Sequence, residues 1–134
     1  STGTSAGNVI VLDGSAKLPA VDGSALTNLP SGSAPTITAV TQSTTPYPAS
    51  GTLSTSGIEQ VYLINADSVN VVVNLPASSA AGSGFKYQIK NTSATYNLIL
   101  TPASGTIDGA STREITVENE SITLVADGSN WFII

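Results

Sequence analysis

The stretch that decides the fold is Phe85-Lys86-Tyr87-Gln88-Ile89-Lys90-Asn91, about two thirds of the way along the chain. Large apolar side chains alternate with Lys and Gln. Successive side chains of a strand point to opposite faces, so this run predicts a β-strand with one buried and one solvated face. The side chains expected to face the core are Phe85, Tyr87 and Ile89, and those expected to face solvent or a neighbour are Lys86, Gln88 and Lys90.

Similar β-rich runs lie on both sides of residues 85–91. They cover residues 37–40, 59–65, 70–75, 97–101, 107–109, 114–117, 120–126 and 131–134. Asp67-Ser68 predicts a turn that joins residues 59–65 and 70–75 in a hairpin. The small residues of 77–84 predict a flexible loop. No segment keeps a helical apolar spacing over ten residues, so the sequence predicts an all-β fold, an antiparallel β-sandwich or barrel-like knob over residues 36–134.

Residues 1–35 differ from the rest, being rich in Gly, Ser and Ala. They contain Asp-Gly-Ser-Ala twice, and each copy leads to Leu-Pro, at residues 13–19 and 22–30. Asp-Gly favours tight turns and Pro stops helices and central strands, so we expect an extended, irregular arm. Its apolar residues recur too often for a solvated linker, which favours packing onto a partner chain. The expected oligomer or capsid contacts are Val9, Val11, Leu12, Leu18, Val21, Leu26 and Leu29.

The amino-acid composition limits the functions that the chain can have. Only 10% of the residues are charged, against about 25% in ordinary globular proteins, and there is no Cys, Met or His. Disulfides, cysteine nucleophiles and imidazole bases are therefore excluded, and we expect no metal site and no cofactor. Four cations against nine carboxylates cannot form a basic stripe, so nucleic acid is not an expected partner. Membrane insertion is not expected either, since no apolar run approaches the roughly 20 residues that span a bilayer.

Both ends of the chain resemble a known group of proteins. Gly7-Asn8-Val9-Ile10-Val11-Leu12-Asp13, with Lys17 to Leu29, resembles a segment that recurs in tail-fibre, spike and other appendage proteins of tailed bacteriophages. Residues 107–109, 122–125 and 127–134 resemble the final hairpin of small β-sandwich modules in those proteins. The resemblance covers about half of the chain. It implies a non-enzymatic homotrimer on the virion surface, made in the host cytoplasm, with the major capsid protein or other virion proteins as further partners.

Two placements on the virion remain open at this point. If the 134 residues are the whole product, the chain is short for a fibre, which favours a knob that decorates or cements the capsid. If the chain is the end of a longer protein, a tail-fibre or spike tip that binds a host-surface glycan is favoured. Tyr47, which lies between two prolines, and Tyr96 are the candidate glycan contacts. Trp131 could join them, but it continues into the apolar run to Ile134 and is expected in the core.

Two patterns suggest catalysis, and each has a simpler interpretation. Ser83 to Lys86 matches Ser-x-x-Lys, but the Lys lies on the polar side of the strand and no companion motif follows. Glu118 and Glu120 could share a strand face as the acid pair of a glycan hydrolase. Seven aromatic residues leave too few to line a sugar groove after the core is filled, so solvated edge charges are the expected role. A small carboxylate-dependent hydrolase remains a remote alternative.

Three further carboxylates, Asp67, Asp108 and Asp127, lie in expected turns. Their side chains are expected to accept hydrogen bonds from local backbone N–H groups. No Asp-x-Asp-x-Asp-Gly loop for calcium is present.

Overall fold

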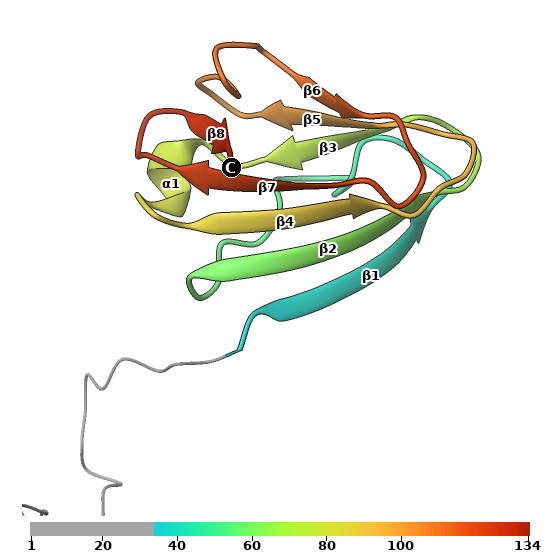
Figure 1. Cartoon of the computed structure of the whole chain (residues 1–134), viewed down its shortest axis with the longest axis horizontal. Helices are drawn as coiled ribbons and strands as arrows, with labels where there is room; N and C mark the ends of the chain where they lie inside the picture. Colours follow the sequence, from blue (N-terminus) through green and yellow to red (C-terminus); the bar gives the residue numbers. More distant parts are fainter. Residues whose placement is uncertain (1–33) are drawn as a thin grey trace, which may run out of the picture. The chain divides into compact units, whose positions relative to one another are not determined.

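The computed structural model describes residues 34–134, which form eight strands and one short helix (Figure 1). The all-β prediction is confirmed. The expected arm contacts, from Val9 to Leu29, lie outside the described residues, so they stay a prediction. The elements are β1 (Thr36–Gln42), β2 (Glu59–Ala66), β3 (Val71–Leu75), α1 (Ser78–Ala81), β4 (Lys86–Asn91), β5 (Leu98–Pro102), β6 (Arg113–Ile115), β7 (Ser121–Ala126) and β8 (Trp131–Ile133).

The strands form two separate mixed sheets. The larger sheet has the order β1-β2-β4-β7-β8, and the smaller has the order β3-β5-β6. β1, β2 and β4 are mutually parallel, as are β3 and β5, whereas β6, β7 and β8 join by antiparallel pairing. The expectation of an antiparallel fold is therefore wrong, and the described strands do not close into a barrel.

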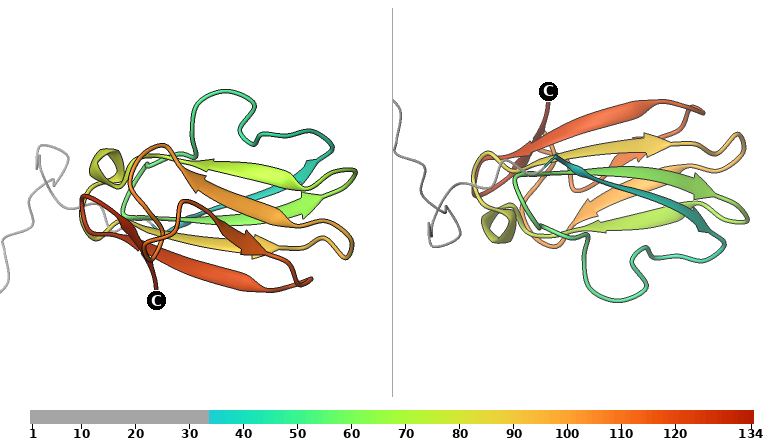
Figure 2. Two further views of the ribbon diagram at one scale, coloured as in Figure 1. Left: turned by 90° about the horizontal axis from the view of Figure 1, so that it is seen from above. Right: turned by 90° about the horizontal axis from the view of Figure 1, so that it is seen from below.

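The parallel pairing comes from the way the chain crosses between the sheets. After β2 the chain passes through residues 67–70 into β3 of the smaller sheet, and after β4 it passes through residues 92–97 into β5. Both crossings lie at the same end of the domain (Figures 1 and 2). Two arches that cross in the same direction stack with their strands parallel. The predicted hairpin of 59–65 with 70–75 is wrong, because its two strands belong to different sheets.

The inward side chains of both sheets form one hydrophobic core. On β4 and just before it, Phe85, Tyr87 and Ile89 are at most 4% exposed, whereas Lys86 and Gln88 are exposed. The predicted assignment of these side chains to a buried and an exposed face is confirmed. Trp131 of β8 is fully buried, as expected.

The segment between β3 and β4, expected as a flexible loop, contains α1. Ser78 at the start of this helix is 1% exposed, and its Oγ accepts a hydrogen bond from the Gly128 N–H (3.0 Å). The helix turn is thereby attached to the turn between β7 and β8.

Candidate functional site: the free edge and outer face of the larger sheet

The residues weighed as catalytic do not form a site. Ser83 and Lys86 are both exposed. Glu118 lies in the turn between β6 and β7, and Glu120 follows it, with its Oε2 accepting a hydrogen bond from the Val117 N–H (3.4 Å). The shared strand face suggested for the two glutamates is therefore wrong. Within residues 34–134 no three Asp or Glu side chains gather closely enough to hold a metal ion.

Of the three turn carboxylates, only Asp127 binds its own turn. Its Oδ1 accepts hydrogen bonds from the N–H groups of Ser129 (2.7 Å) and Asn130 (2.6 Å), and these bonds hold the pKa of the carboxyl below its usual value. Asp108 instead accepts from the Ile133 N–H (3.2 Å), and Asp67 from the Ser43 hydroxyl (3.1 Å). The latter two carboxylates thus connect separate segments rather than a single turn.

The two candidate glycan contacts are both partly buried against the core. The Tyr47 ring meets the Tyr62 ring edge-on at 6.4 Å between centroids, and burial raises the Tyr47 pKa. Tyr96 has no aromatic ring partner among the described residues, and its backbone N–H and C=O bind Ser93 and Asn91. The structure therefore does not bring the two phenols together into one aromatic platform. The glycan role of each stays a prediction.

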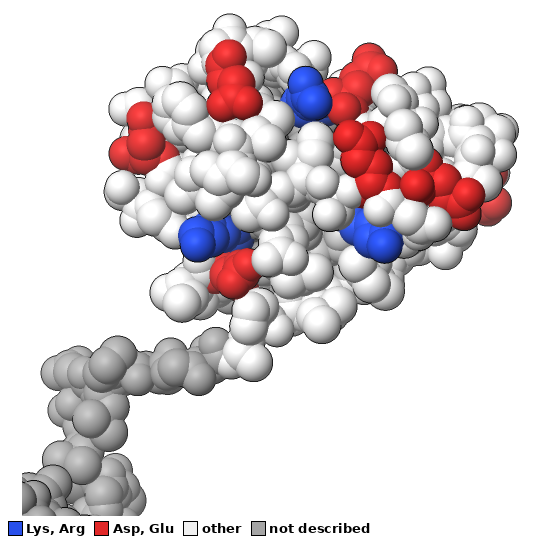
Figure 3. All heavy atoms as spheres, viewed as in Figure 1, with Lys and Arg blue, Asp and Glu red and all other residues white. Residues whose placement is uncertain are grey.

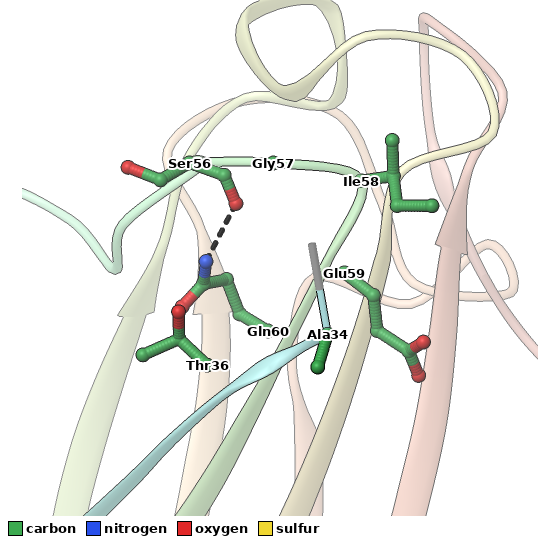
Figure 4. A pocket seen from close by; sticks show the side chains of 7 residues that line it. All are labelled: Ala34, Thr36, Ser56, Gly57, Ile58, Glu59 and Gln60. Atoms are coloured by element: carbon green, nitrogen blue, oxygen red, sulfur yellow. Dashed lines mark hydrogen bonds between the residues drawn. The ribbon is translucent and has the colours of Figure 1, made fainter. Parts of the chain in front are cut away.

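A shallow hollow opens where the chain enters β1 (Figure 4). It has a volume of about 110 Å³, and Ala34 and Thr36 line it from the β1 side. The side chain of Gln60 closes its floor, being 3% exposed and donating from Nε2 to the Ser56 carbonyl. Its lining includes Ile58, whose side chain is 78% exposed and points away from Ala34 in the close-up. The hollow is too small for a drug-sized ligand, since such pockets measure roughly 300–1,000 Å³.

Two of the four sheet edges are covered by other segments of the chain. Beside β8, the Trp131 N–H donates to the Thr106 carbonyl (2.8 Å) and the Asp108 N–H donates to the Trp131 carbonyl (3.0 Å). Beside β3, the Tyr47 N–H donates to the Val72 carbonyl and the Asn74 N–H to the Tyr47 carbonyl (both 2.8 Å). These hydrogen bonds occupy outer backbone groups of both strands within the chain.

The remaining edges differ in length and charge. β6 has three residues, of which Arg113 and Glu114 are charged and exposed, and short charged edges resist pairing with other chains. β1 has seven residues, and no hydrogen-bonded strand or segment among the described residues lies along its free edge. Residues 34–58, which include β1, contain no charged side chain. β1 is therefore the one long, unprotected edge in the described part of the chain.

The outer face of the larger sheet carries two apolar patches, one on each side. The first, here called the β1 flank, consists of Ile37, Ala39, Val61 and Leu63. The second, the β8 flank, consists of Val125, Phe132 and Ile134. Ile37 and Ile134 are 67% and 68% exposed.

Polar side chains of β4 separate the two flanks. The outward residues of this strand are Lys86, Gln88 and Lys90. Gln88 Nε2 donates to Glu59 Oε1 (2.9 Å), which holds one carboxylate in this polar row. In Figure 3 the margin of the domain where Figure 1 shows β1 carries no charged atoms. The β1 margin is thus suited to contact with another chain, because interface centres are depleted of charge.

Sequence reasoning missed the β8 flank. It placed residues 131–134 in an apolar core strand, but only Trp131 of this run is fully buried. The strand period of two already puts Phe132 and Ile134 on the face opposite Trp131, so the signal was present in the sequence.

Comparison with protein-family models, curated proteins and solved structures finds no match to the chain. No helix in residues 34–134 has the length and apolarity to span a bilayer.

Proposed function

We propose that this protein is a non-enzymatic structural protein of a bacteriophage virion. In this proposal it forms a homotrimer in which an extended N-terminal arm leads into a β-sandwich knob, and the knobs decorate or cement the capsid surface. The observation that carries the proposal is the free β1 edge, which within residues 34–134 has neither the charges nor the covering segment of the other sheet edges. An edge of this kind favours association with another chain.

The outer face supports the same function. A single copy leaves Ile37 and Ile134 more than half exposed, each within an uncharged patch of the outer sheet face. Burying such side chains between chains contributes about 1.5–3 kcal/mol each. The candidate acids, by contrast, have no common geometry that a hydrolase would need. Adhesion by apolar and backbone contacts therefore accounts for more of the described surface than catalysis does.

The arm fits this picture because its chain enters the knob at Ala34, directly before β1. The residues of the arm that are expected as contacts are apolar. Contacts of this composition depend little on ion pairs. Binding to capsids should therefore persist at high salt, unlike contacts steered by charge.

Virions of the phage that encodes the chain provide the test. Purified particles are analysed by quantitative mass spectrometry for the copy number of the chain, and by cryo-electron microscopy for its position. The proposal predicts hundreds of copies per particle, seen as three-fold knobs on the capsid. A few dozen copies or fewer, found on the tail, would move the protein to a fibre or spike tip and contradict the capsid role.

A second experiment tests whether the protein is free of catalytic activity. The purified trimer is incubated with host surface polysaccharide, and released sugar ends are measured beside a Glu118→Gln, Glu120→Gln variant. The proposal predicts no turnover by either protein. Turnover that the double substitution abolishes would contradict the non-enzymatic function.

A further inference from the structure

We propose that the trimer closes head to tail, with the β1 flank of each copy packed against the β8 flank of the next. This inference rests on the proposed homotrimer and names the surfaces that build it. Its starting point is that the chain carries two different apolar patches on one sheet face, and that neither is covered within the described residues.

The two flanks cannot cover each other within one copy. Ile37 lies in register with Val61, Val61 with Gln88, and Gln88 with Thr123, while the Ile134 N–H donates to the Thr123 carbonyl (3.0 Å). Ile37 and Ile134 thus end the same row across the sheet. Four strand spacings of about 4.8 Å separate them, or about 19 Å. Only a second molecule can bring the two side chains together.

The positions of the flanks favour contact between unlike surfaces. Two different patches at opposite edges of one sheet face can pair between copies in a heterologous interface, which closes into a ring when the rotation permits. Three sheets placed around an axis would each offer the β1 flank to one neighbour and the β8 flank to the other. Every copy would then use both patches, and none would be left exposed at the end of the assembly.

The charge distribution agrees with a second copy as the occupant. Ile37 and Ala39 of the β1 flank belong to a charge-free stretch, residues 34–58, and the other residues of both flanks are also uncharged. A basic or acidic partner would find no complementary charge on either patch. The lysines of β4 lie between the flanks, so the two apolar patches can meet without burying an unpaired charge.

Lysine substitutions locate the interface. Ile37→Lys and Ile134→Lys alter side chains that are exposed in the single chain, so the fold should persist, which circular dichroism checks. Each should weaken trimer association at least about tenfold by sedimentation, the loss expected when a central interface contact is removed. The matched control is Val117→Lys, because Val117 is 60% exposed in the β6–β7 turn outside both flanks. This control should leave association unchanged.

Introduced cysteines identify which surfaces pair, and the chain has no native Cys to interfere. Under mild oxidation the chain with both Ile37→Cys and Ile134→Cys should give a covalent trimer, whereas each single variant should give none. A disulfide needs Cα atoms within about 7 Å, so the two positions cannot be joined within one chain.

The outcomes separate this proposal from the one it rests on. A trimer that tolerates both lysines, or that gives no covalent trimer from the double-cysteine chain, would overturn the head-to-tail interface and leave the trimer standing. Covalent dimers from either single-cysteine variant would mean like-to-like contact and would also overturn it. A wild-type chain that is monomeric would instead contradict the proposed function itself.

Discussion

The indole ring of Trp131 lies 5.3 Å from the phenol ring of Tyr87, measured between ring centroids. Trp131 is in β8 and Tyr87 in β4 of the larger sheet, and both side chains are fully buried. The indole Nε1–H also donates to the Pro76 carbonyl (3.0 Å), just after β3 of the smaller sheet. The ring contact of Trp131 therefore lies within the larger sheet, and its buried hydrogen bond connects this sheet to the end of β3 in the smaller one.

Replacing this side chain should be costly. Trp131→Ala should lower the free energy of unfolding by about 3–5 kcal/mol, the range for removing a large aromatic side chain from a core. Trp131→Phe should keep most of the packing but leave the Pro76 carbonyl without its donor, at about 1–3 kcal/mol. Urea denaturation of the full chain measures both losses. A loss from Trp131→Phe as large as that from Trp131→Ala would show that the hydrogen bond, and not the packing, dominates.

Two substitutions in β4 test which of its side chains face the core. Ile89→Ala should lower the free energy of unfolding by about 2–5 kcal/mol because Ile89 is fully buried. Lys86→Ala, on the exposed face, should change it by no more than about 0.5 kcal/mol. Both values come from the same denaturation experiment. Equal losses at the two positions would contradict the observed register.

Asn91 carries a buried polar link between the sheets. Its Nδ2 donates to the Tyr96 carbonyl (3.1 Å) and the Ile115 carbonyl (3.2 Å), and its Oδ1 accepts from the Ser93 N–H (2.9 Å). Asn91→Ala would leave these buried groups unpaired, at about 1–3 kcal/mol for each group that water cannot reach. We expect unfolding at lower urea and faster amide exchange at Ser93. Unchanged exchange there would contradict the role given to the side chain.

Asp127 makes stability depend on acidity in a defined direction. Its pKa is lowered in the folded chain by the N–H groups of Asn130 and Ser129. A lowered folded-state pKa adds stability above the unfolded value of about 3.9, and the contribution is lost as pH falls through the folded pKa. Asp127→Ala should therefore lower the melting temperature at neutral pH, and the difference from wild type should shrink in acid. A difference that persists below the folded-state pKa would mean that the aspartate acts by another route.

The sequence predicts strands well here and their partners poorly. Alternation along residues 85–91 correctly assigns each side chain to a face, and it extends to Asn91, whose burial depends on carbonyl groups of distant segments. Alternation does not say which strand lies alongside. Residues 67–70 have the composition of a hairpin turn, but Asn70 Oδ1 accepts from the Asn97 N–H (2.9 Å), so the segment crosses towards β5.

The candidate surface, too, can be predicted from the sequence only in part. The lack of charge over residues 34–58 is visible in the sequence, as is the alternation that exposes Phe132 and Ile134. That β1 is an edge strand, and that the other edges are covered or charged, depends on strand order. Strand order arises from the stacked arches, which are long-range contacts that local patterns do not encode.

Removal of residues 1–33 tests the arm separately from the knob. Each buried Val or Leu of the arm would contribute about 1.5–3 kcal/mol to assembly, so the shortened chain should dissociate at higher protein concentration than the full chain. Sedimentation equilibrium over a concentration series measures this difference. Identical dissociation constants for the two proteins would contradict a role of the arm in assembly.

The most direct test of the central claim, a self-associating structural protein, is the mass of the full chain in solution. Light scattering coupled to size-exclusion chromatography, at micromolar concentration, gives this mass independently of shape. The account predicts a single species of three 13.5 kDa chains, about 40 kDa, which remains intact at high salt because its contacts are apolar. A species of 13.5 kDa under the same conditions would contradict it.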